Sequence, residues 1–218
     1  MIPEAIVFDR DGVLADFQIY DAITFFQPLL PISLKELTNR WEILGNNVGF
    51  PRSVLEEKSF FVGFWNKICD ELDLSTETRQ CLLRFNYTQY MKAYSDAFPA
   101  MTHARQQKLK VGVLSNFALA SLDASLEAIG LHNFVDIACA APVIGSAKPQ
   151  PEAYLTICHK LNVKPKNCLF FDDEIDCVEG ARTVGMKAFH VDRAKKRHQI
   201  HLGIVRDLNI IPEILACH

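Results

Sequence analysis

Residues 5–12 read Ala-Ile-Val-Phe-Asp-Arg-Asp-Gly, four apolar side chains followed at once by two carboxylates that flank an arginine, and then a glycine. Apolar runs of the same kind recur at 111–114, 135–141, 168–171 and 188–191. A short, uniformly apolar run is typical of a strand that is buried on both faces, as in a parallel sheet. The five runs therefore predict a parallel sheet whose two faces are covered.

Helix-like stretches separate the later runs. They lie at 118–129, which is followed by a glycine, at 151–161, which begins with Pro-Glu, and at 175–184, which is also followed by a glycine. Glycine just beyond a helix and proline in its first turn are common end signals. Strands and helices that alternate in this way form right-handed βαβ units. The expected fold is α/β, a doubly wound parallel sheet of the Rossmann-like kind.

The stretch 16–96 has a different texture. It contains both tryptophans and shows helical patterns at 21–30, 34–44, 54–74 and 76–94. About 80 residues are too many for a single connection between two strands, which usually takes a dozen or more. We therefore expect an inserted α-helical cap at 16–96, and an α/β core formed by 1–15 and 97–218.

The composition excludes several classes of protein. The 218 residues carry 23 Lys+Arg and 26 Asp+Glu, a formal net charge of −3, which gives no reason to expect nucleic acid or an anionic membrane as a partner. No stretch approaches the ~20 apolar residues that span a bilayer, and the N-terminus does not resemble a signal peptide. Seven cysteines without a Cys-x-x-Cys spacing suit free thiols in a reducing compartment. We expect a soluble cytoplasmic protein.

Reactive polar residues follow four of the five predicted strands. They are Asp9 and Asp11 after the first, Ser115 and Asn116 after the second, Lys148 after the third, and Asp172 and Asp173 after the fourth. Ligands of open parallel sheets bind at the carboxyl ends of the strands, so these side chains are expected at one rim. Crowded carboxylates repel one another unless a cation neutralises them, and oxygen ligands favour a hard cation. The pattern indicates Mg²⁺.

Four motifs carry a family resemblance. They are Asp-Arg-Asp-Gly-Val-Leu-Ala-Asp (9–16), Leu-Ser-Asn (114–116), Lys-Pro (148–149) and Phe-Asp-Asp followed by Gly-Met (171–186). Any one of them alone is weak, but together and in this order they resemble the haloacid dehalogenase superfamily of phosphohydrolases. The similarity extends over about residues 4–16 and 98–192. A helical cap inserted after the first strand is similar to the subfamily that contains phosphoglycolate phosphatase, β-phosphoglucomutase and sugar-phosphate phosphatases.

The resemblance implies a role for each polar residue at the rim. Asp9 corresponds to the nucleophile that becomes an aspartyl-phosphate, a form of covalent catalysis by a carboxylate. Asp11 corresponds to the general acid and base. Ser115 and the backbone N–H of Asn116 correspond to groups that hold phosphate oxygens, and Lys148 to the cation that balances the charge of nucleophile and phosphoryl group.

The resemblance also implies a metal site and a turn. Mg²⁺ is expected to bind through Asp9, the carbonyl of Asp11 and Asp173, with Asp172 close by. Gly12 lets the backbone turn away behind the two aspartates of the first motif, next to the bound substrate. Within the cap, the Gly/Asn-rich loop at 44–52 is the candidate substrate loop, with Arg52 as the contact.

Two positions depart from the family pattern. Arg10 stands where an aliphatic residue is usual, and strand alternation predicts that it points away from the site and needs a partner for its charge. Cys177 stands where the family has Asp or Asn, so the metal is expected to bind less tightly unless Asp176 compensates.

The leading hypothesis is a Mg²⁺-dependent phosphatase that acts on a small phosphorylated metabolite. Carbon–halogen cleavage is disfavoured because dehalogenases of this pattern lack the second aspartate, here Asp11. A phosphosugar mutase and a non-catalytic binding or regulatory protein remain as alternatives. Three further features are expected to have no role in binding or catalysis. His198 and His201 lack a third metal ligand, the basic run 193–197 is solvated, and the aromatic residues at 60–65 form the core of the cap.

Overall fold

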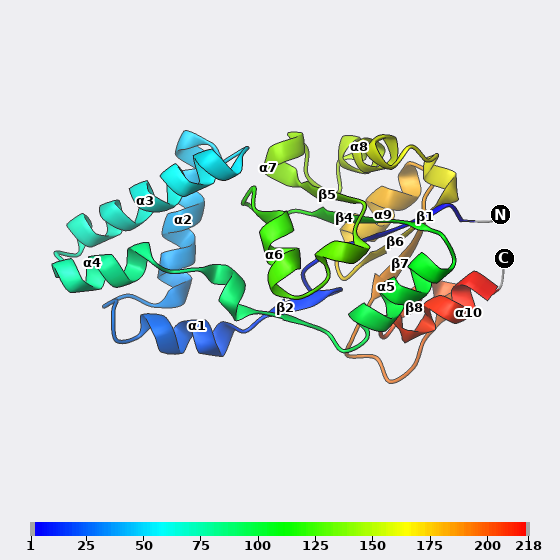
Figure 1. The fold of residues 1–218 in the computed structure, drawn as a ribbon, viewed down its shortest axis with the longest axis horizontal. Helices are drawn as coiled ribbons and strands as arrows, with labels where there is room; N and C mark the ends of the chain where they lie inside the picture. The colour runs from blue at the N-terminus through cyan, green and yellow to red at the C-terminus, as the bar shows by residue number, and fades with distance from the viewer. Residues whose placement is uncertain (1–2, 217–218) are drawn as a thin grey trace.

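The computed structural model describes residues 3–216, and its centre is one parallel sheet (Figure 1). Six strands lie in the order β5-β4-β1-β6-β7-β8, and every neighbouring pair is parallel. Their bounds are β1 Ala5–Phe8, β4 Lys110–Ser115, β5 Ile137–Ala140, β6 Cys168–Asp172, β7 Lys187–Val191 and β8 Ile204–Val205. Strands β5, β4 and β1 form one side of the sheet, and the later strands β6, β7 and β8 form the other. The predicted doubly wound α/β fold is confirmed.

The order of the strands places a switch point between β1 and β6. In sheets of this kind the crevice outside the carboxyl ends of the strands at the switch point is where ligands bind. The five predicted strands correspond to β1, β4, β5, β6 and β7. The sixth, β8, has only two residues and pairs with β7 at the edge of the sheet. A run that short carries no periodicity in the sequence, which is why it was not predicted.

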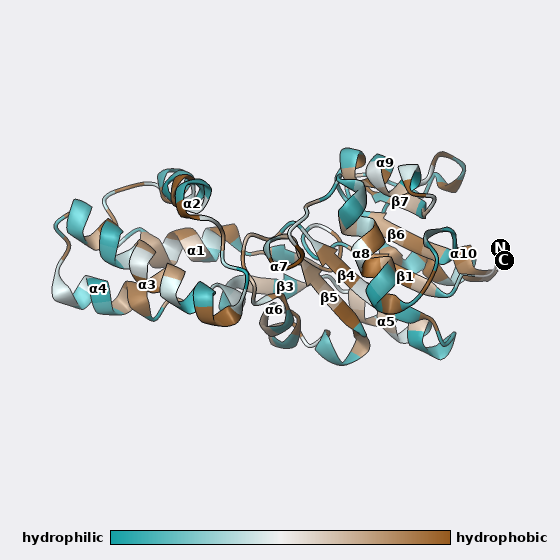
Figure 2. Cartoon of the chain, turned by 90° about the horizontal axis from the view of Figure 1, so that it is seen from above, coloured by the Kyte–Doolittle hydropathy of each residue, from teal (hydrophilic) through white to brown (hydrophobic). Residues whose placement is uncertain are grey.

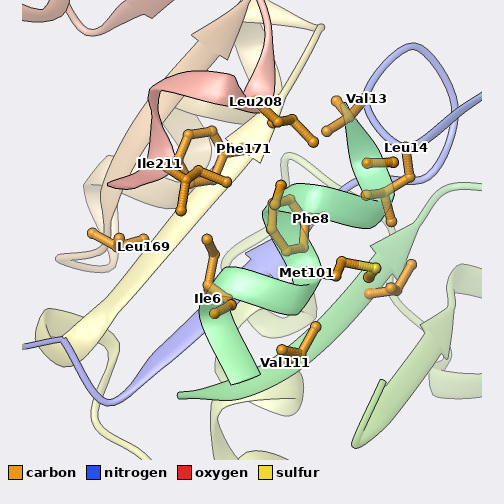
Figure 3. Close-up of a cluster of buried hydrophobic side chains, with 14 of the residues drawn as sticks. Ile6, Phe8, Val13, Leu14, Met101, Val111, Leu169, Phe171, Leu208 and Ile211 are labelled. Atoms are coloured by element: carbon orange, nitrogen blue, oxygen red, sulfur yellow. The ribbon is translucent and has the colours of Figure 1, made fainter. Parts of the chain in front are cut away.

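Helices cover both faces of the sheet because side chains alternate along each strand. On β1, Ile6 and Phe8 pack into one apolar cluster with α5 (Ala97–Gln106) and α10 (Ile211–Ala216), as Figure 3 shows. Ala5 and Val7 point to the opposite face and pack into a second cluster with α8 (Pro151–Leu161) and α9 (Ile175–Thr183). The shorter helices α6 (Leu122–Ala128) and α7 (Ala141–Ile144) follow β4 and β5.

The segment 16–96, which we call the cap, stands at one end of the molecule beside the sheet (Figures 1 and 2). Its helices are α1 (Ile19–Phe26), α2 (Leu34–Val48), α3 (Val54–Glu71) and α4 (Thr76–Leu83). Serine side chains cap α2, α3 and α4 by accepting a hydrogen bond from a backbone N–H in the first turn. A third apolar cluster, which includes Phe26, Phe64 and Trp65, lies among the helices.

The end of the cap differs from the sequence prediction. A helix was expected over 76–94, but α4 ends at Leu83, a 3₁₀ turn follows at Tyr87–Tyr90, and Met91–Ala93 forms the strand β3. β3 pairs antiparallel with β2 (Ala15–Phe17), 74 residues or more away in the sequence. Pairing with so distant a strand overrides the local helical pattern. This two-stranded ribbon carries the chain into the cap and back.

An arginine of the basic run anchors the loop after β1 to the core. Arg193 donates from Nε to the carbonyl of Gly12 at 2.9 Å and from Nη2 to the carbonyl of Val13 at 2.6 Å. Its Nη1 lies 3.2 Å from both carboxylate oxygens of Asp96, which also accepts the N–H of Leu208 at 2.6 Å. The interpretation of this run as merely solvated is therefore wrong for Arg193. No helix within residues 3–216 is long and apolar enough to span a membrane.

Removal of the Asp96 carboxylate is expected to destabilise the fold. Asp96→Ala leaves the Arg193 charge and the Leu208 N–H without their acceptor, which lowers the free energy of unfolding by about 2–3 kcal/mol. The matched control is Asp123→Ala, at an exposed position on α6, with an expected change below about 1 kcal/mol. Denaturant unfolding followed by circular dichroism measures both. Equal midpoints for the two variants would contradict the anchoring role.

Candidate active site

The loop after β1 turns sharply and places Asp9 at the switch point. The N–H of Asp9 continues the sheet by donating to the carbonyl of Phe171 at 2.8 Å, and the Arg10 carbonyl accepts from both Leu14 and Ala15 at 2.9 Å. Gly12 has a φ of +71°, and a Cβ at this position would lie 2.0 Å from Oδ2 of Asp173. Only glycine permits this approach, so Gly12 brings the two acidic loops together as well as forming the turn.

Lys148 is the charge centre of the rim. Its Nζ lies 2.6 Å from Oδ1 of Asp9 and 2.7 Å from Oδ2 of Asp172, and the residue is only 5% exposed. The side chain of Asn116 fixes the Lys148 backbone on both sides, since Nδ2 donates to the Lys148 carbonyl and Oδ1 accepts the Lys148 N–H, each at 2.8 Å. The sequence predicted a role only for the N–H of Asn116. The structure adds a positioning role for its side chain.

Burial dominates the electrostatics of these groups. Desolvation raises the pKa of Asp9 from 3.8 to about 7, although the Lys148 ammonium acts in the opposite direction. Desolvation raises the pKa of Asp172 as well, again against Lys148. Partial desolvation and the neighbouring Asp172 raise the pKa of Asp173. Burial alone would lower the pKa of Lys148, but the two carboxylates prevail and hold it above its usual range.

The donor set fits a hard divalent cation. Carboxylate oxygens of Asp9, Asp172 and Asp173 lie within 4.8 Å of one another. When all three are ionised, one ammonium balances only one of their three negative charges, so a cation in their midst is favourable. Carboxylate oxygens are the ligands that Mg²⁺ prefers, and the Gly12 turn leaves room for Asp173 beside them.

Cys177 lies next to this cluster, and its surroundings favour the protonated thiol. It is buried, its Sγ donates to Oε2 of Glu174 at 3.2 Å, and burial together with Asp172 raises the pKa of the thiol. Glu174, which sequence reasoning did not single out, groups with Asp172 and Cys177, with their possible ligand atoms within 4.8 Å of one another. Asp176 is exposed and belongs to neither of the acidic groupings found among the described residues.

Arg10 finds its partner in Asp11 itself. The guanidinium is 1% exposed, and it holds the Asp11 carboxylate by two hydrogen bonds, Nη2 to Oδ2 at 2.7 Å and Nε to Oδ1 at 3.1 Å. Nη1 donates to Ser125 at 2.9 Å, and the guanidinium lies 3.9 Å from the ring centroid of Phe117. The expectation that Arg10 points away from the chemistry is wrong, because its side chain folds back onto the neighbouring carboxylate.

The remaining predicted residues lie in two places. Ser115 ends β4 beside β1, is 1% exposed, and accepts the Phe117 N–H at 3.2 Å. Arg52 is exposed and lines a separate cavity of about 550 Å³ formed by its own loop and the start of α3. Ser115 thus joins the rim, whereas Arg52 does not lie with the other candidates, and its role stays a prediction.

A buried glutamate that the sequence did not reveal joins the cap to the core. Glu57 of α3 is 7% exposed and accepts the backbone N–H of Ser121 at 2.7 Å and its hydroxyl at 2.5 Å. The hydroxyl of Tyr87, also from the cap, lies 2.8 Å from Ser121 Oγ. Ser121 precedes α6, so the carboxylate also sits at a helix N-terminus, where negative charge is favourable. This contact closes the cap onto the loop that follows β4.

Comparison with known proteins supports this assignment of the fold. The family described as haloacid dehalogenase-like hydrolase matches residues 3–185. The phosphatase MT3486 of Mycobacterium tuberculosis is 39% identical over 212 residues, which cover 97% of this chain and 96% of that protein. A HAD phosphatase structure from Thermococcus onnurineus matches with a TM-score of 0.67 at 23% identity, covering 97% of each chain. The L-2-haloacid dehalogenase RSc1362 has the same TM-score at 19% identity, covering 99% of this chain and 100% of that one.

The doubly wound sheet, with its acidic rim at the switch point, gives this protein a Rossmann-like α/β fold. The chain belongs to the haloacid dehalogenase-like hydrolase family, and within it to the phosphoric monoester hydrolases. The predicted family and enzyme class are confirmed.

Loss of the Glu57 carboxylate is expected to loosen the cap from the core. Glu57→Ala removes two hydrogen bonds to a charged acceptor, so amide hydrogen exchange across 117–125 should accelerate about 10- to 100-fold. Glu42→Ala, at an exposed glutamate on α2, is the matched control and should leave exchange in this segment unchanged. Identical protection in both variants would show that Glu57 does not hold the two parts together.

Proposed function

We propose that this protein is a Mg²⁺-dependent phosphatase that hydrolyses the monophosphate ester of a small metabolite through an aspartyl-phosphate on Asp9. The observation that carries the proposal is the buried Lys148 ammonium, which contacts Asp9 and Asp172 at the switch point of the sheet. Phosphoryl transfer depends mainly on positioning and charge neutralisation, and this arrangement supplies both.

In the first step a carboxylate oxygen of Asp9 attacks phosphorus, the bond between phosphorus and the alcohol oxygen breaks, and Asp11 gives its proton to that oxygen. In the second step Asp11 takes a proton from water, the water oxygen attacks the phosphoryl group, and inorganic phosphate leaves as Asp9 is restored. Ser115 and the N–H of Asn116 bind phosphoryl oxygens, while Lys148 balances their charge.

The metal would be held by Asp9, the carbonyl of Asp11 and Asp173, with Asp172 beside them. When bound, Mg²⁺ neutralises charge on the phosphoryl oxygens and orients the group for attack. Gly12 keeps the substrate side of the loop open. Arg52, which lines a separate cavity, is the proposed contact from the candidate substrate loop. The free, mostly buried cysteines suit a reducing compartment, so we place the enzyme in the cytoplasm, without nucleic-acid or membrane partners.

Substitution of the nucleophile tests the mechanism. Asp9→Asn should lower kcat for p-nitrophenyl phosphate at least about 10³-fold, because the amide cannot form the acyl-phosphate. The matched control is Asp16→Asn, at an exposed position in β2, which should retain wild-type kcat. Assays in Mg²⁺ and in EDTA give the metal dependence. Undiminished turnover in Asp9→Asn, or in EDTA, would falsify the mechanism.

The same assays, run with a panel of phosphorylated metabolites, separate the alternatives. Sustained release of inorganic phosphate is expected, whereas an isomer formed without release would identify a mutase. Chloride released from 2-chloropropionate would instead identify carbon–halogen cleavage. A protein that binds the esters without turnover would be a binding module.

Metal affinity should depend on pH with a definite sign. Protonation of Asp9 removes a ligand, and its pKa in the metal-free protein is about 7, so Mg²⁺ binding weakens as the pH falls through 7. Calorimetric titration should give a dissociation constant about tenfold larger at pH 6 than at pH 8. A constant that does not change between these pH values would show that Asp9 is not a ligand.

A further inference from the structure

The cap and the core enclose a large cavity next to the first motif. Its volume is about 1010 Å³, at the upper end of the range for pockets that hold drug-sized ligands. Helices α1, α2 and α3 of the cap and the loop after β4 supply its wall. Rings and aliphatic side chains dominate the lining, among them Phe26, Trp41, Trp65, Phe85, Phe117 and Leu119.

The cavity meets the reaction at the leaving-group side. Arg10 and Asp11 line it, and the Asp11 side chain is 47% exposed. If Asp11 is the acid that protonates the departing oxygen, as the proposed function has it, the organic part of the ester extends from that oxygen into this cavity. The occupant is therefore the alcohol portion of the substrate.

The inner surface offers few free hydrogen-bonding groups. Arg10 directs all three of its guanidinium nitrogens to Asp11 and Ser125, and the Tyr87 hydroxyl contacts Ser121. Thr38 donates its hydroxyl hydrogen to the carbonyl of its own helix four residues back. Gln27 and Lys35 also line the cavity but are exposed to solvent.

The mouth of the cavity is apolar as well. Ile19 and Ile23 lie one turn apart on α1, both line the cavity, and they remain 49% and 39% exposed. Large apolar side chains left open beside a catalytic group mark a surface that a ligand covers. The same apolar side chains cannot hydrogen-bond to the hydroxyls of a sugar.

We propose that the substrate is the phosphate monoester of a bulky apolar alcohol, with a cyclic, aromatic or branched aliphatic group. Such a group leaves water and fills the cavity, which is favourable in proportion to its apolar area. A polyhydroxylated sugar would have to give up hydrogen bonds to water without replacing them, which is costly. A two- or three-carbon alcohol would leave most of the volume unfilled. The lining therefore selects against phosphosugars and phosphoglycolate, although the core of the enzyme resembles theirs.

A matched pair of esters tests the proposal. Cyclohexylmethyl phosphate and glucose 6-phosphate both carry a six-membered ring on a primary phosphate ester, and the first lacks the ring oxygen and hydroxyls. The value of kcat/KM for cyclohexylmethyl phosphate should exceed that for glucose 6-phosphate at least about 100-fold. 2-Naphthylmethyl phosphate serves as the aromatic arm and 3-methylbutyl phosphate as the branched aliphatic one. Equal or better hydrolysis of glucose 6-phosphate would overturn the proposal.

Variants of partly exposed residues locate the preference in the cavity without threatening the fold. Ile23→Asn should reduce the ratio of the two kcat/KM values about tenfold. Ile43→Asn is the matched control, because Ile43 is a 50% exposed isoleucine on α2 that does not line the cavity, and its ratio should equal that of the wild type. An unchanged ratio in Ile23→Asn would place the selection elsewhere and overturn the assignment to this cavity.

A binding measurement separates this proposal from the proposed function. Calorimetry with Asp9→Asn should show cyclohexylmethyl phosphate binding at least about tenfold more tightly than glucose 6-phosphate. If the wild type hydrolyses neither these esters nor p-nitrophenyl phosphate, the phosphatase mechanism fails, and the binding preference alone then supports or overturns the apolar site. No preference in binding would overturn it.

Discussion

One buried ammonium, that of Lys148, holds the acidic rim together. The sheet order places β1 next to β6, so the carboxylates that follow these strands converge in a site with little water. Without an opposite charge, Asp9 and Asp172 would repel each other or take up protons. Lys148 lies between them because the side chain of Asn116, at the end of β4, hydrogen-bonds to the backbone N–H and carbonyl of Lys148. The strand order, the Asn116 amide and the Lys148 ammonium therefore depend on one another. Substitution of Asn116 or Lys148 disturbs the same charge balance.

Local sequence patterns predicted the parts of the fold that depend on local burial. Strands β1 and β6 are buried on both faces, so a short apolar run followed by acids was sufficient to locate them and the rim. β3 was not predictable in this way, because its three residues form a strand only by pairing with β2, where Phe17 lies opposite Met91. The direction of the Arg10 side chain was predicted wrongly for a related reason. Strand alternation fixes where its Cβ points, but its long side chain bends back to reach Asp11. Glu57 and Arg193 act through partners more than 60 residues away, which no local pattern encodes.

One loop of the core, 117–121, contacts both the cap and Arg10. On the core side, Phe117 stacks against Arg10 and also lines the apolar cavity, so the wall of the cavity and the partner of Asp11 are the same structural unit. On the cap side, Glu57 binds Ser121, four residues after Phe117 in the same loop. The cap and the surroundings of Asp11 are therefore connected through a segment of five residues, 117–121. The loop therefore contacts both the cap and the arginine that binds Asp11.

The ribbon of β2 and β3 has a consequence for how such proteins diversify. Ala15 and Ala93 are direct neighbours in the ribbon, so everything between them enters and leaves the core at a single point. The two ends of the inserted segment are so close that a short turn could join them. Asp9, Lys148 and Asp172 all lie outside the inserted segment, and the contacts among them involve none of its residues. The cap residues that line the cavity can therefore vary in sequence while the contacts of Lys148 are kept.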